Sequence, residues 1–327
     1  MTYTFEIESS PNWAKLDQFS DRTIFQTQAW QAFVAEAQHG SPVVLRIFES
    51  NQCVGYFTGL VVKRYGLKIL GSPFPGWTTS YLGFNLLGDV SRDAVFQDLA
   101  TFAFRELGCA HVEMMDRRLA VKDVVAHGWK HRIFRNFEID LTPSEDDIFG
   151  QMKGSCRTSI RKSQREGVTI EIASDPQFAD DYFGQMSDVF AKQGLKPTYS
   201  VERVRLLMKH LMPTGNLLLL RARTASGECA ATGIYPAFND TMYFWGGASS
   251  RQFQILQPNE PLHWYAMLYW KEQGIAKCDM GGGGDYKRKY GGYDIEVPWI
   301  RKSRYPGLEF ARRLAQKMQE RRQRLQS

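Results

Sequence analysis

The spacing of apolar residues divides the first part of the chain into helices, where they recur about every 3.6 residues, and strands, where they alternate with polar residues. Two runs rich in β-branched and aromatic residues flank the polar tetrapeptide 49–52, and this arrangement predicts a β-hairpin. The elements predicted here are a helix at 25–37, hairpin strands at 43–48 and 53–62, a helix at 91–107 and a strand at 133–141.

The second part of the chain is predicted to contain further helices around a group of strands. Thr142 as N-cap, Pro143 at the first helical position and Glu145 as the capping-box acid predict a helix that runs to Arg165 and stops at Gly167. The other predicted elements are a strand at 168–173, helices from 174 to 194 and from 200, strands at 217–223, 229–236 and 242–246, a helix at 259–273, and strands at 276–280 and 295–300. This order indicates an α/β fold with mixed (α+β) sheets.

A ten-residue pattern occurs twice, at 105–114 and at 271–280, with a constant spacing of 166 residues between Glu113 and Asp279. Each copy reads as a helix that a glycine stops, followed by a short strand that ends in an acid and a methionine. We interpret the two copies as related α/β units, of which the second has acquired a glycine-rich loop.

The composition is sufficient for two hydrophobic cores, because 43% of the 327 residues are hydrophobic. The predicted boundaries are a first lobe at 1–141, a second lobe at 142–304 and a basic C-terminal helix at 305–327. The opening residues lack the features of a signal peptide, and no apolar run approaches the ~20 residues that span a bilayer. A cytoplasmic protein is therefore predicted, with peripheral contact at the inner membrane face as an option.

Cysteine and histidine contribute little candidate chemistry. The five cysteines are odd in number and never form CxxC, which predicts reduced thiols in the core. The six histidines are scattered and show no metal-binding spacing, so no metal site is predicted.

The formal net charge of +6 arises at the end of the chain. From Arg301 onward there are nine Lys or Arg against Glu309 and Glu320, a balance of +7, so the preceding 300 residues carry −1. A second basic cluster comprises Lys153, Arg157, Arg161, Lys162 and Arg165, opposed only by Glu166. Both clusters suggest an anionic partner: a phosphate or pyrophosphate, RNA or a membrane face.

The segment Asp279–Gly292, DMGGGGDYKRKYGG, is the principal candidate site. Its glycines let the backbone approach a ligand and expose amides that can hold an anion or an oxyanion. A flexible connection is the alternative, but the flanking Asp279, Asp285 and Lys287 favour a site. The three cations at 287–289 are expected to alternate across a strand, and an inward Lys287 would stabilise the oxyanion of an acyl-transfer intermediate.

Other candidate residues have an ordinary structural interpretation beside the functional one. Arg157, Arg161 and Arg165 share one helical stripe, which fits either a ligand or a solvated face. Lys192 and Lys196 lie at a predicted helix end and suit a phosphate contact. Glu113 and Asp116 could act as acid or base, or could be polar residues at a strand end. The aromatic residues 264, 265, 269 and 270 are interpreted as core and interface side chains.

Three segments together resemble the Fem-type aminoacyltransferases of the GNAT superfamily and the related acetyltransferases of polysaccharide and cellulose synthesis. They are Phe25–Trp30, Cys156–Val168, and Asp279 with its glycines followed by Tyr286-Lys287-Arg288-Lys289-Tyr290-Gly291. The last is similar to the family's aspartate-glycine-glycine stretch and its aromatic-Lys-x-x-aromatic-Gly signature. The similarity in pattern and order extends over most of residues 20–300.

This resemblance implies a tandem pair of GNAT-like lobes with the substrate between them, and a C-terminal segment that returns to the first lobe. It implies that Lys287 supports the transfer chemistry with Tyr286 beside it, and that substrate phosphates bind near Lys192 and Lys196. With the candidates above, the predicted catalytic residues are Lys287, Asp279, Asp285 and Glu113. The predicted substrate-binding residues are Tyr286, Gly282, Gly283, Arg157, Arg161, Lys192 and Lys196.

The predicted function is transfer of an acyl or aminoacyl group to an amine or hydroxyl of a cell-envelope or exopolysaccharide precursor. No tightly bound cofactor is expected, and the donor is either an acyl-CoA or an aminoacyl-tRNA. The expected partners are a phosphate-bearing or polyprenyl-linked envelope precursor, tRNA if it is the donor, and an anionic membrane in peripheral contact. Two alternatives stay open: a plain acetyl-CoA-dependent N-acetyltransferase, and a non-catalytic GNAT-like module that binds RNA or an anionic membrane surface.

Overall fold

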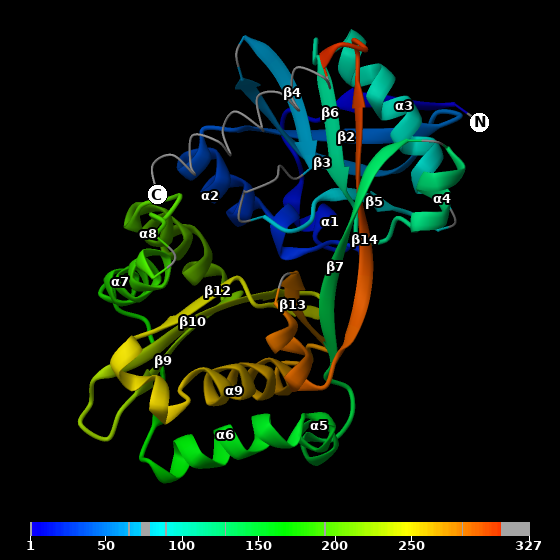
Figure 1. Cartoon of the computed structure of the whole chain (residues 1–327). Coiled ribbons are helices and arrows are strands. Elements are labelled where there is room, and N and C mark those ends of the chain that lie inside the picture. The colour runs from blue at the N-terminus through cyan, green and yellow to red at the C-terminus, as the bar shows by residue number, and fades with distance from the viewer. Residues whose placement is uncertain are drawn as a thin grey trace. The chain divides into compact units, whose positions relative to one another are not determined.

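The computed structural model describes residues 2–64, 66–72, 79–88, 90–127, 129–192, 194–282 and 284–308. The chain divides into two compact units, one containing residues up to Phe134 and those from Glu296, the other Arg135–Ile295. The chain passes between the units within β7 (Lys130–Asp140) and within β14 (Tyr293–Ser303), so most of β14 belongs to the first unit although it follows the second unit in the sequence. Figure 1 labels these elements.

The first unit is built on a mixed sheet with short helices. Its strands lie in the order β1 (Tyr3–Ile7), β2 (Ser41–Glu49), β3 (Gln52–Arg64), β4 (Leu67–Ser72), β6 (His111–Met115) and β14, and β5 (Gly83–Leu86) pairs with β3. Only β4 and β6 are parallel among these pairs. The helices are α1 (Trp13–Leu16), the 3-10 helix η1 (Ile24–Gln26), α2 (Gln28–Gln38), α3 (Arg92–Arg105) and α4 (Val121–Ala126).

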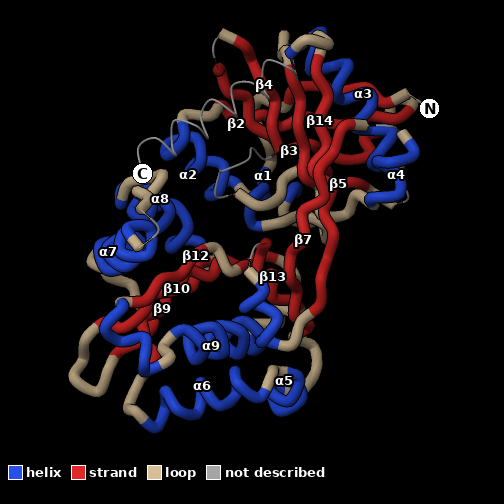
Figure 2. The backbone as a smooth tube through the Cα atoms, viewed as in Figure 1, coloured by secondary structure: helices blue, strands red, loops and turns tan. Residues whose placement is uncertain are grey.

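The second unit has the same kind of mixed sheet, with helices on both faces (Figure 2). Its strand order is β7, β13 (Lys277–Gly282), β11 (Thr241–Tyr243), β10 (Cys229–Phe238), β9 (Leu217–Arg223) and β8 (Thr169–Ile172), and β12 (Gly246–Ser249) also pairs with β10. The helices are α5 (Glu145–Gln151), α6 (Gly154–Arg165), α7 (Phe178–Ala191), α8 (Val201–Leu211), α9 (Asn259–Glu272), and the 3-10 helices η2 (Met212–Thr214), η3 (Arg251–Leu256) and η4 (Asp285–Tyr290).

Helix α9 is the central helix of the second unit. It packs against β9 and β10, while α6 covers its outer side and α7 contacts β10 and β12 (Figure 1). Trp270 is buried here, and Trp264, Tyr265 and Tyr269 pack against the same core, as predicted.

The internal repeat has the same local structure in both units. Gly108 and Gly274 both adopt positive φ, at 65° and 84°, which ends α3 and α9 in a conformation that favours glycine. The next strand in each copy, β6 or β13, lies parallel to an earlier strand, β4 or β11. The prediction of two related α/β units is confirmed at this level.

Two predicted boundaries need correction. The helix expected from 142 to 165 is two helices, because Met152 is extended (φ −64°, ψ 147°) and interrupts it, and the N-cap is Ser144 rather than Thr142. Residues 296–303 belong to the first unit because β14 pairs with β6 there, whereas the second lobe was expected to reach 304. Most of the predicted C-terminal basic helix, 309–327, lies outside the described residues.

All five cysteines are free thiols. Cys109, Cys156 and Cys278 are buried, and Cys53 and Cys229 are partly buried, in agreement with the prediction of reduced thiols. Burial raises the pKa of the Cys156 thiol to about 11, so this sulfur stays protonated and unreactive near neutral pH.

Candidate functional site

The central strands of the second unit part beside the glycine-rich segment. β11 runs parallel to β13 as far as Tyr243 and Asp279, and the Phe244 amide still donates to the Asp279 carbonyl at 2.9 Å. One residue later the Trp245 amide donates instead to Ile234 of β10, and β12 continues along β10. β12 and β13 therefore diverge at this point.

The 3-10 helix η4 follows the glycine-rich segment, where an extended strand was expected. Gly281 and Gly284 have φ of 69° and 89°, so the chain turns where only glycine does so without strain. Residues three apart share a face of a 3-10 helix, which explains why Lys287 and Tyr290 are both buried. Arg288 instead faces solvent and pairs with Asp294 at 2.8 Å.

The ammonium of Lys287 lies beneath the glycine-rich segment. Its side chain is 7% exposed, and Nζ donates hydrogen bonds to the carbonyls of Met280 at 2.5 Å and Gly282 at 2.8 Å. Burial lowers the pKa of Lys287 below its ordinary value, although the nearby Asp279 carboxylate opposes the shift. Asp279 is itself buried and accepts a hydrogen bond from the Gly281 amide at 2.7 Å.

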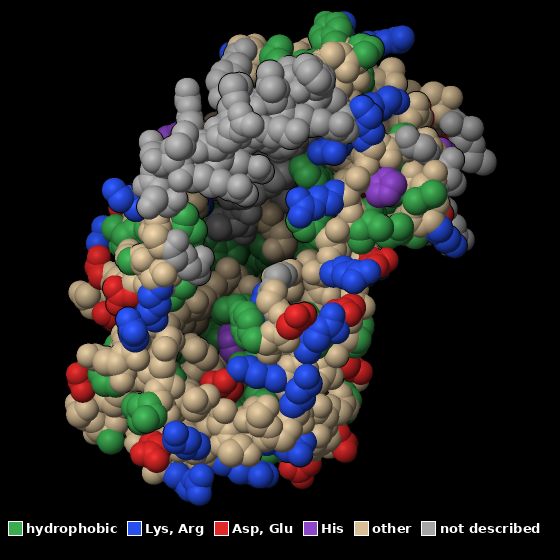
Figure 3. All heavy atoms as spheres, in the orientation of Figure 1, with side chains coloured by type: hydrophobic (Ala, Val, Ile, Leu, Met, Phe, Trp, Pro, Cys, Tyr) green, Lys and Arg blue, Asp and Glu red, His purple; other side chains and the backbone are tan. Residues whose placement is uncertain are grey.

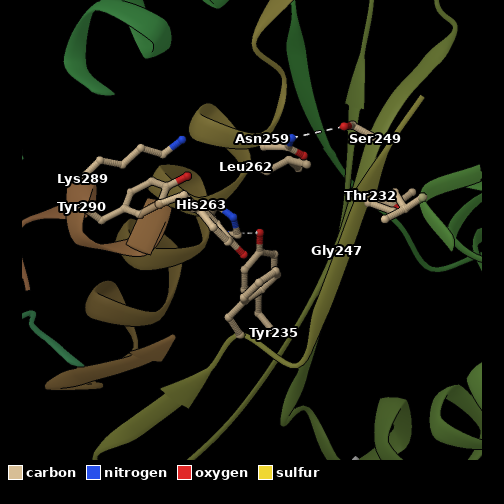
Figure 4. A pocket seen from close by; sticks show the side chains of 13 residues that line it. Thr232, Tyr235, Gly247, Ser249, Asn259, Leu262, His263, Lys289 and Tyr290 are labelled. Carbon is tan, nitrogen blue, oxygen red and sulfur yellow. Dashed lines mark hydrogen bonds between the residues drawn. The ribbon is translucent and has the colours of Figure 1, made fainter. Parts of the chain in front are cut away.

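A pocket of about 190 Å³ lies beside η4, between β10, β12 and the first turns of α9. Tyr235, Phe244, Tyr286 and Tyr290 form aromatic walls. Figure 4 shows Tyr235 and Tyr290 on one side of the pocket and the small residue Gly247 on the strand side. The ring centroids of Phe244 and Tyr286 lie 5.6 and 5.9 Å from Lys287 Nζ. The buried ammonium is thus adjacent to two walls of the pocket.

His263 of α9 is a buried titratable group in this pocket. It is 5% exposed, its Nδ1 lies 2.9 Å from the Tyr235 hydroxyl (Figure 4), and its ring packs edge-on against Phe244 and Tyr290. Burial, together with the nearby positive charges of Lys289 and Lys287, lowers the pKa of His263 to about 3. The imidazole is therefore neutral near pH 7.

Two polar pairs complete the edge of the pocket. Lys289 Nζ forms an ion pair with Glu260 at 2.5 Å and lies 5.3 Å from the centroid of the Tyr290 ring. Asn259 Nδ2 donates to Ser249 Oγ at 3.2 Å across the opening between α9 and β12 (Figure 4). Hydrogen bonds thus fix the positions of these groups before any ligand binds.

The predicted catalytic residues do not all meet. Lys287 and Asp279 lie together, as described. The Asp285 carboxylate is fully exposed and lies 3.5 Å from Arg288, on the outer side of η4. Glu113 is buried in β6 of the first unit, so it belongs to a different compact unit from Lys287.

The predicted substrate-binding residues are also dispersed. Tyr286 lines the pocket and is half exposed. At Gly282, a Cβ atom would lie 2.9 Å from Asn136 Oδ1 and 3.2 Å from the Arg135 carbonyl, so glycine is required here by the neighbouring strand β7. Gly283 lies outside the described residues, and Lys192 and Lys196 are exposed at the end of α7 and beyond it.

The arginines of α6 have structural partners. Arg157 Nη1 donates to the carbonyls of Gly150 and Met152, both at 2.6 Å, and so caps the end of α5. The Arg161 guanidinium lies 5.2 Å from the ring centroid of Phe149. Cationic side chains gather over α6 at the lower edge of Figure 3, so a solvated basic face describes this helix better than a site for a buried ligand.

Sequence reasoning missed His263, its partner Tyr235 and the Lys289–Glu260 pair. The available signal was that Glu260 and His263 are polar residues three positions apart in the first turns of a helix whose middle is apolar, and so share one helical face. Only the tertiary structure reveals that His263 lines the pocket and that Glu260 pairs with Lys289 at its edge.

Residues 150–290 match the family model described as an acetyltransferase (GNAT) domain. This segment is similar to a GNAT domain. It covers most of the second unit, including the diverging strands, α9 and η4. A search of the curated proteins returns no significant match to the chain.

Solved structures resemble the chain over nearly its whole length at low sequence identity. The crystal structure of FemX has a TM-score of 0.70 at 13% identity, and the match covers 92% of this chain and 97% of FemX. A tandem GNAT protein from the clavulanic acid biosynthesis pathway has a TM-score of 0.58 at 11% identity, with 93% and 99% covered. The C-terminal domain of a putative lysylphosphatidylglycerol synthetase from Agrobacterium fabrum gives 0.54 at 12%, with 89% and 92% covered.

These likenesses show the fold, a mixed α/β architecture of the tandem GNAT type, as the sequence predicted. No helix among the described residues is both long enough and apolar enough to cross a membrane.

Proposed function

We propose that the protein is an acyltransferase whose GNAT domain transfers an acyl or aminoacyl group to an amine or hydroxyl of a cell-envelope precursor. The observation that carries this proposal is the buried Lys287, which lies where β12 and β13 diverge and beside an aromatic-walled pocket. A cation in a site shielded from water stabilises developing negative charge far better than one at the surface.

The chemistry assigns Lys287 to the carbonyl oxygen of the donor. The acceptor atom forms a bond to the acyl carbon, the bond from that carbon to the donor's oxygen or sulfur breaks, and the acceptor's proton ends on the leaving group. Among the described residues, Met280 and Gly282 take two of the three ammonium protons of Lys287, so the third is available for the oxyanion.

Asp279 acts on Lys287 rather than on the substrate in this proposal. Its negative charge favours the protonated form of Lys287, and its hydrogen bond to Gly281 holds the glycine-rich turn. Because that bond occupies the Gly281 amide, we assign the oxyanion to Lys287 and not to this amide. The exposed position of Asp285 gives no support to the catalytic role expected for it.

A phosphate-bearing envelope precursor is the proposed acceptor. The fold likeness to FemX and to a putative lysylphosphatidylglycerol synthetase supports this class of reaction, as does the sequence resemblance to Fem-type enzymes. The GNAT domain supports an acyl-CoA as the donor in general, and aminoacyl-tRNA is the second donor proposed.

The two donors are distinguished by thermal shift and by transfer. A site ligand at 100 times its Kd adds about 2.7 kcal/mol to the free energy of unfolding. The purified protein is heated with acetyl-CoA or with charged tRNA, and donor consumption is then measured with envelope precursors, with Lys287→Met as the inactive control. A response to acetyl-CoA alone identifies an N-acetyltransferase, and a response to charged tRNA identifies an aminoacyltransferase.

A protein that responds to neither donor but binds RNA or anionic vesicles is a binding module. That result would contradict the proposed enzyme.

A further inference from the structure

The transfer chemistry proposed above leaves one buried titratable group of the pocket without a role. His263 lines the pocket with its ring edge-on to Phe244 and Tyr290, and among the described residues its one hydrogen-bond partner is the Tyr235 hydroxyl. Burying an imidazole ring costs free energy unless both of its nitrogens find hydrogen-bond partners, and Nδ1 already has one in Tyr235.

The hydrogen bond to Tyr235 determines which ring nitrogen carries the proton. The Tyr235 side chain is buried, and among the described residues His263 Nδ1 is the only partner of its hydroxyl. If Nδ1 carried the proton, the buried O–H of Tyr235 would have no acceptor, which costs roughly 1–3 kcal/mol. The hydroxyl therefore donates to a bare Nδ1, and the proton of the neutral imidazole is on Nε2.

The surroundings keep the imidazole neutral and leave Nε2 as a donor. Lys289 and Lys287 both act on His263 as positive charges, and both oppose its protonation. The one carboxylate beside Lys289, that of Glu260, is already bound to it at 2.5 Å. The Asn259 amide is bound to Ser249. A ligand in the pocket thus meets an N–H donor and positive charge, and no uncommitted carboxylate from these side chains.

The size of the pocket limits the group that this donor can meet. Its volume of about 190 Å³ is somewhat larger than the roughly 150 Å³ of an engineered protein cavity that holds benzene. A six-membered ring or a short branched chain with one polar substituent fits this space.

We propose that His263 determines acyl-group specificity in this pocket: its Nε2–H donates to an oxygen acceptor on the bound acyl group, which is neutral or anionic and not cationic. The identity of the ligand as an acyl group rests on the proposed function, whereas the hydrogen bond itself does not. A cationic side chain would face Lys289 and a donor N–H, both repulsive to it.

Small probes of one size test the specificity without any transfer reaction. Benzamide carries a neutral acceptor, benzoate an anionic one, and benzylamine a cation on the same ring. Full-length protein is titrated with each by calorimetry and thermal shift. We expect benzamide and benzoate to bind and to raise Tm, and benzylamine to do neither. Equal binding of benzylamine would overturn the proposal.

Two variants separate the donor from the packing. In His263→Asn, the side-chain oxygen can replace Nδ1 as acceptor for Tyr235, but the Nε2 donor is lost. In His263→Gln, the amide reaches the Nε2 position and restores a donor. We expect about a fivefold to tenfold loss of benzamide affinity in His263→Asn, the range of one hydrogen bond, and a smaller loss in His263→Gln. Wild-type affinity in His263→Asn would contradict the proposed role.

The tautomer of His263 can be measured directly in the wild-type protein, without any variant. In a histidine-labelled sample, nitrogen NMR should show a protonated Nε2 and a bare Nδ1 for His263 from pH 7 down to pH 5. A protonated Nδ1 would refute the inference. If the probes bind through His263 and no donor is consumed, the proposed acyltransferase activity fails while the specificity of the pocket stands.

Discussion

Lys287 has two roles in this structure: its ammonium stabilises the fold through hydrogen bonds, and in the proposed reaction it binds the oxyanion. Its ammonium holds the carbonyls of Met280 and Gly282, so removal of Nζ leaves two carbonyls without that donor. Loss of this donor in Lys287→Met destabilises the fold, since an unsatisfied buried acceptor costs roughly 1–3 kcal/mol.

We predict that Lys287→Met lowers kcat/KM by at least about a hundredfold, because the loss of one oxyanion donor has that effect. We also predict a lower Tm. Steady-state kinetics and calorimetry measure the two effects, and Arg288→Met, on the solvent-facing side of the same 3-10 helix, is the matched control. Turnover close to wild type in Lys287→Met would remove this residue from the mechanism.

His263 gives the second unit a defined dependence of stability on pH. Its pKa is about 3 in the fold and about 6.5 in the unfolded chain, so between these values the unfolded state binds one more proton. The contribution of the neutral His263 to the free energy of unfolding is fully present above pH 6.5, and it is lost as the pH falls towards 3. One proton corresponds to about 1.4 kcal/mol per pH unit.

We therefore predict that His263→Asn reduces the slope of unfolding free energy against pH by up to about 1.4 kcal/mol per unit between pH 6 and 4. Denaturant titrations at several pH values measure this slope. The variant keeps the residues in contact with His263, namely Tyr235, Phe244 and Tyr290, and the nearby charges of Lys287 and Lys289. An identical slope in both proteins would mean that His263 is protonated in the fold.

The junction of α5 and α6 shows how an apparent binding residue can be structural. Arg157 satisfies two carbonyls at the end of α5, whereas Arg161 lies on the exposed side over the Phe149 ring. Both residues occupy the same helical stripe in the sequence. Their different surroundings follow from the break at Met152, which turns α5 back towards the first turn of α6.

We predict that Arg157→Ala lowers the free energy of unfolding by about 1–2 kcal/mol, since the carbonyls of Gly150 and Met152 lose a charged donor. Arg161→Ala should change it by less than about 1 kcal/mol, because its guanidinium is exposed. Denaturant unfolding of the two variants measures the difference. If both variants instead changed the free energy of unfolding by the same small amount and lost most of their affinity for the acyl donor, the result would support the substrate-binding role predicted for Arg157 and Arg161.

At the scale of the whole molecule, the positive charge is concentrated near the C-terminus. Lys302 and Arg304 are engaged within the first unit, where they donate to Gln97 and to the Phe104 carbonyl. Arg301 lies over the ring of Trp299, 5.1 Å from its centroid. The other six cations of the terminal segment lie in 309–327, outside the described residues. They are the cations that stay available, by sequence, for an anionic partner.

We predict that deletion of residues 309–327 weakens binding to RNA and to anionic vesicles, and that the intact protein's binding weakens as salt increases. The family resemblance implies that this segment returns to the first lobe, so its loss should also lower Tm. Vesicle sedimentation at two salt concentrations and calorimetry test both effects. Unchanged binding and unchanged stability would show that the segment is a disordered extension.

The sequence alone determined the elements and their repetition, because these depend on local patterns. Apolar periodicity placed α9 and the strands around it within a few residues, and the glycines at 108 and 274 marked the helix ends in both copies. The burial of Lys287 could also be anticipated, since the residue adjoins a glycine-rich turn in a family-like motif.

Only the tertiary structure decided which side chains meet. The pocket joins β10, β12, α9 and η4, so the bond between Tyr235 and His263 spans 28 positions that no local pattern links. The chain turns at Gly281 and Gly284, which adopt positive φ, and continues as the 3-10 helix η4 instead of a strand. In this helix Lys287 and Tyr290 share the buried face, while Asp285 is exposed. Burial then fixed the chemistry: the same amino acids would have ordinary pKa values in water, and only desolvation makes His263 a neutral donor.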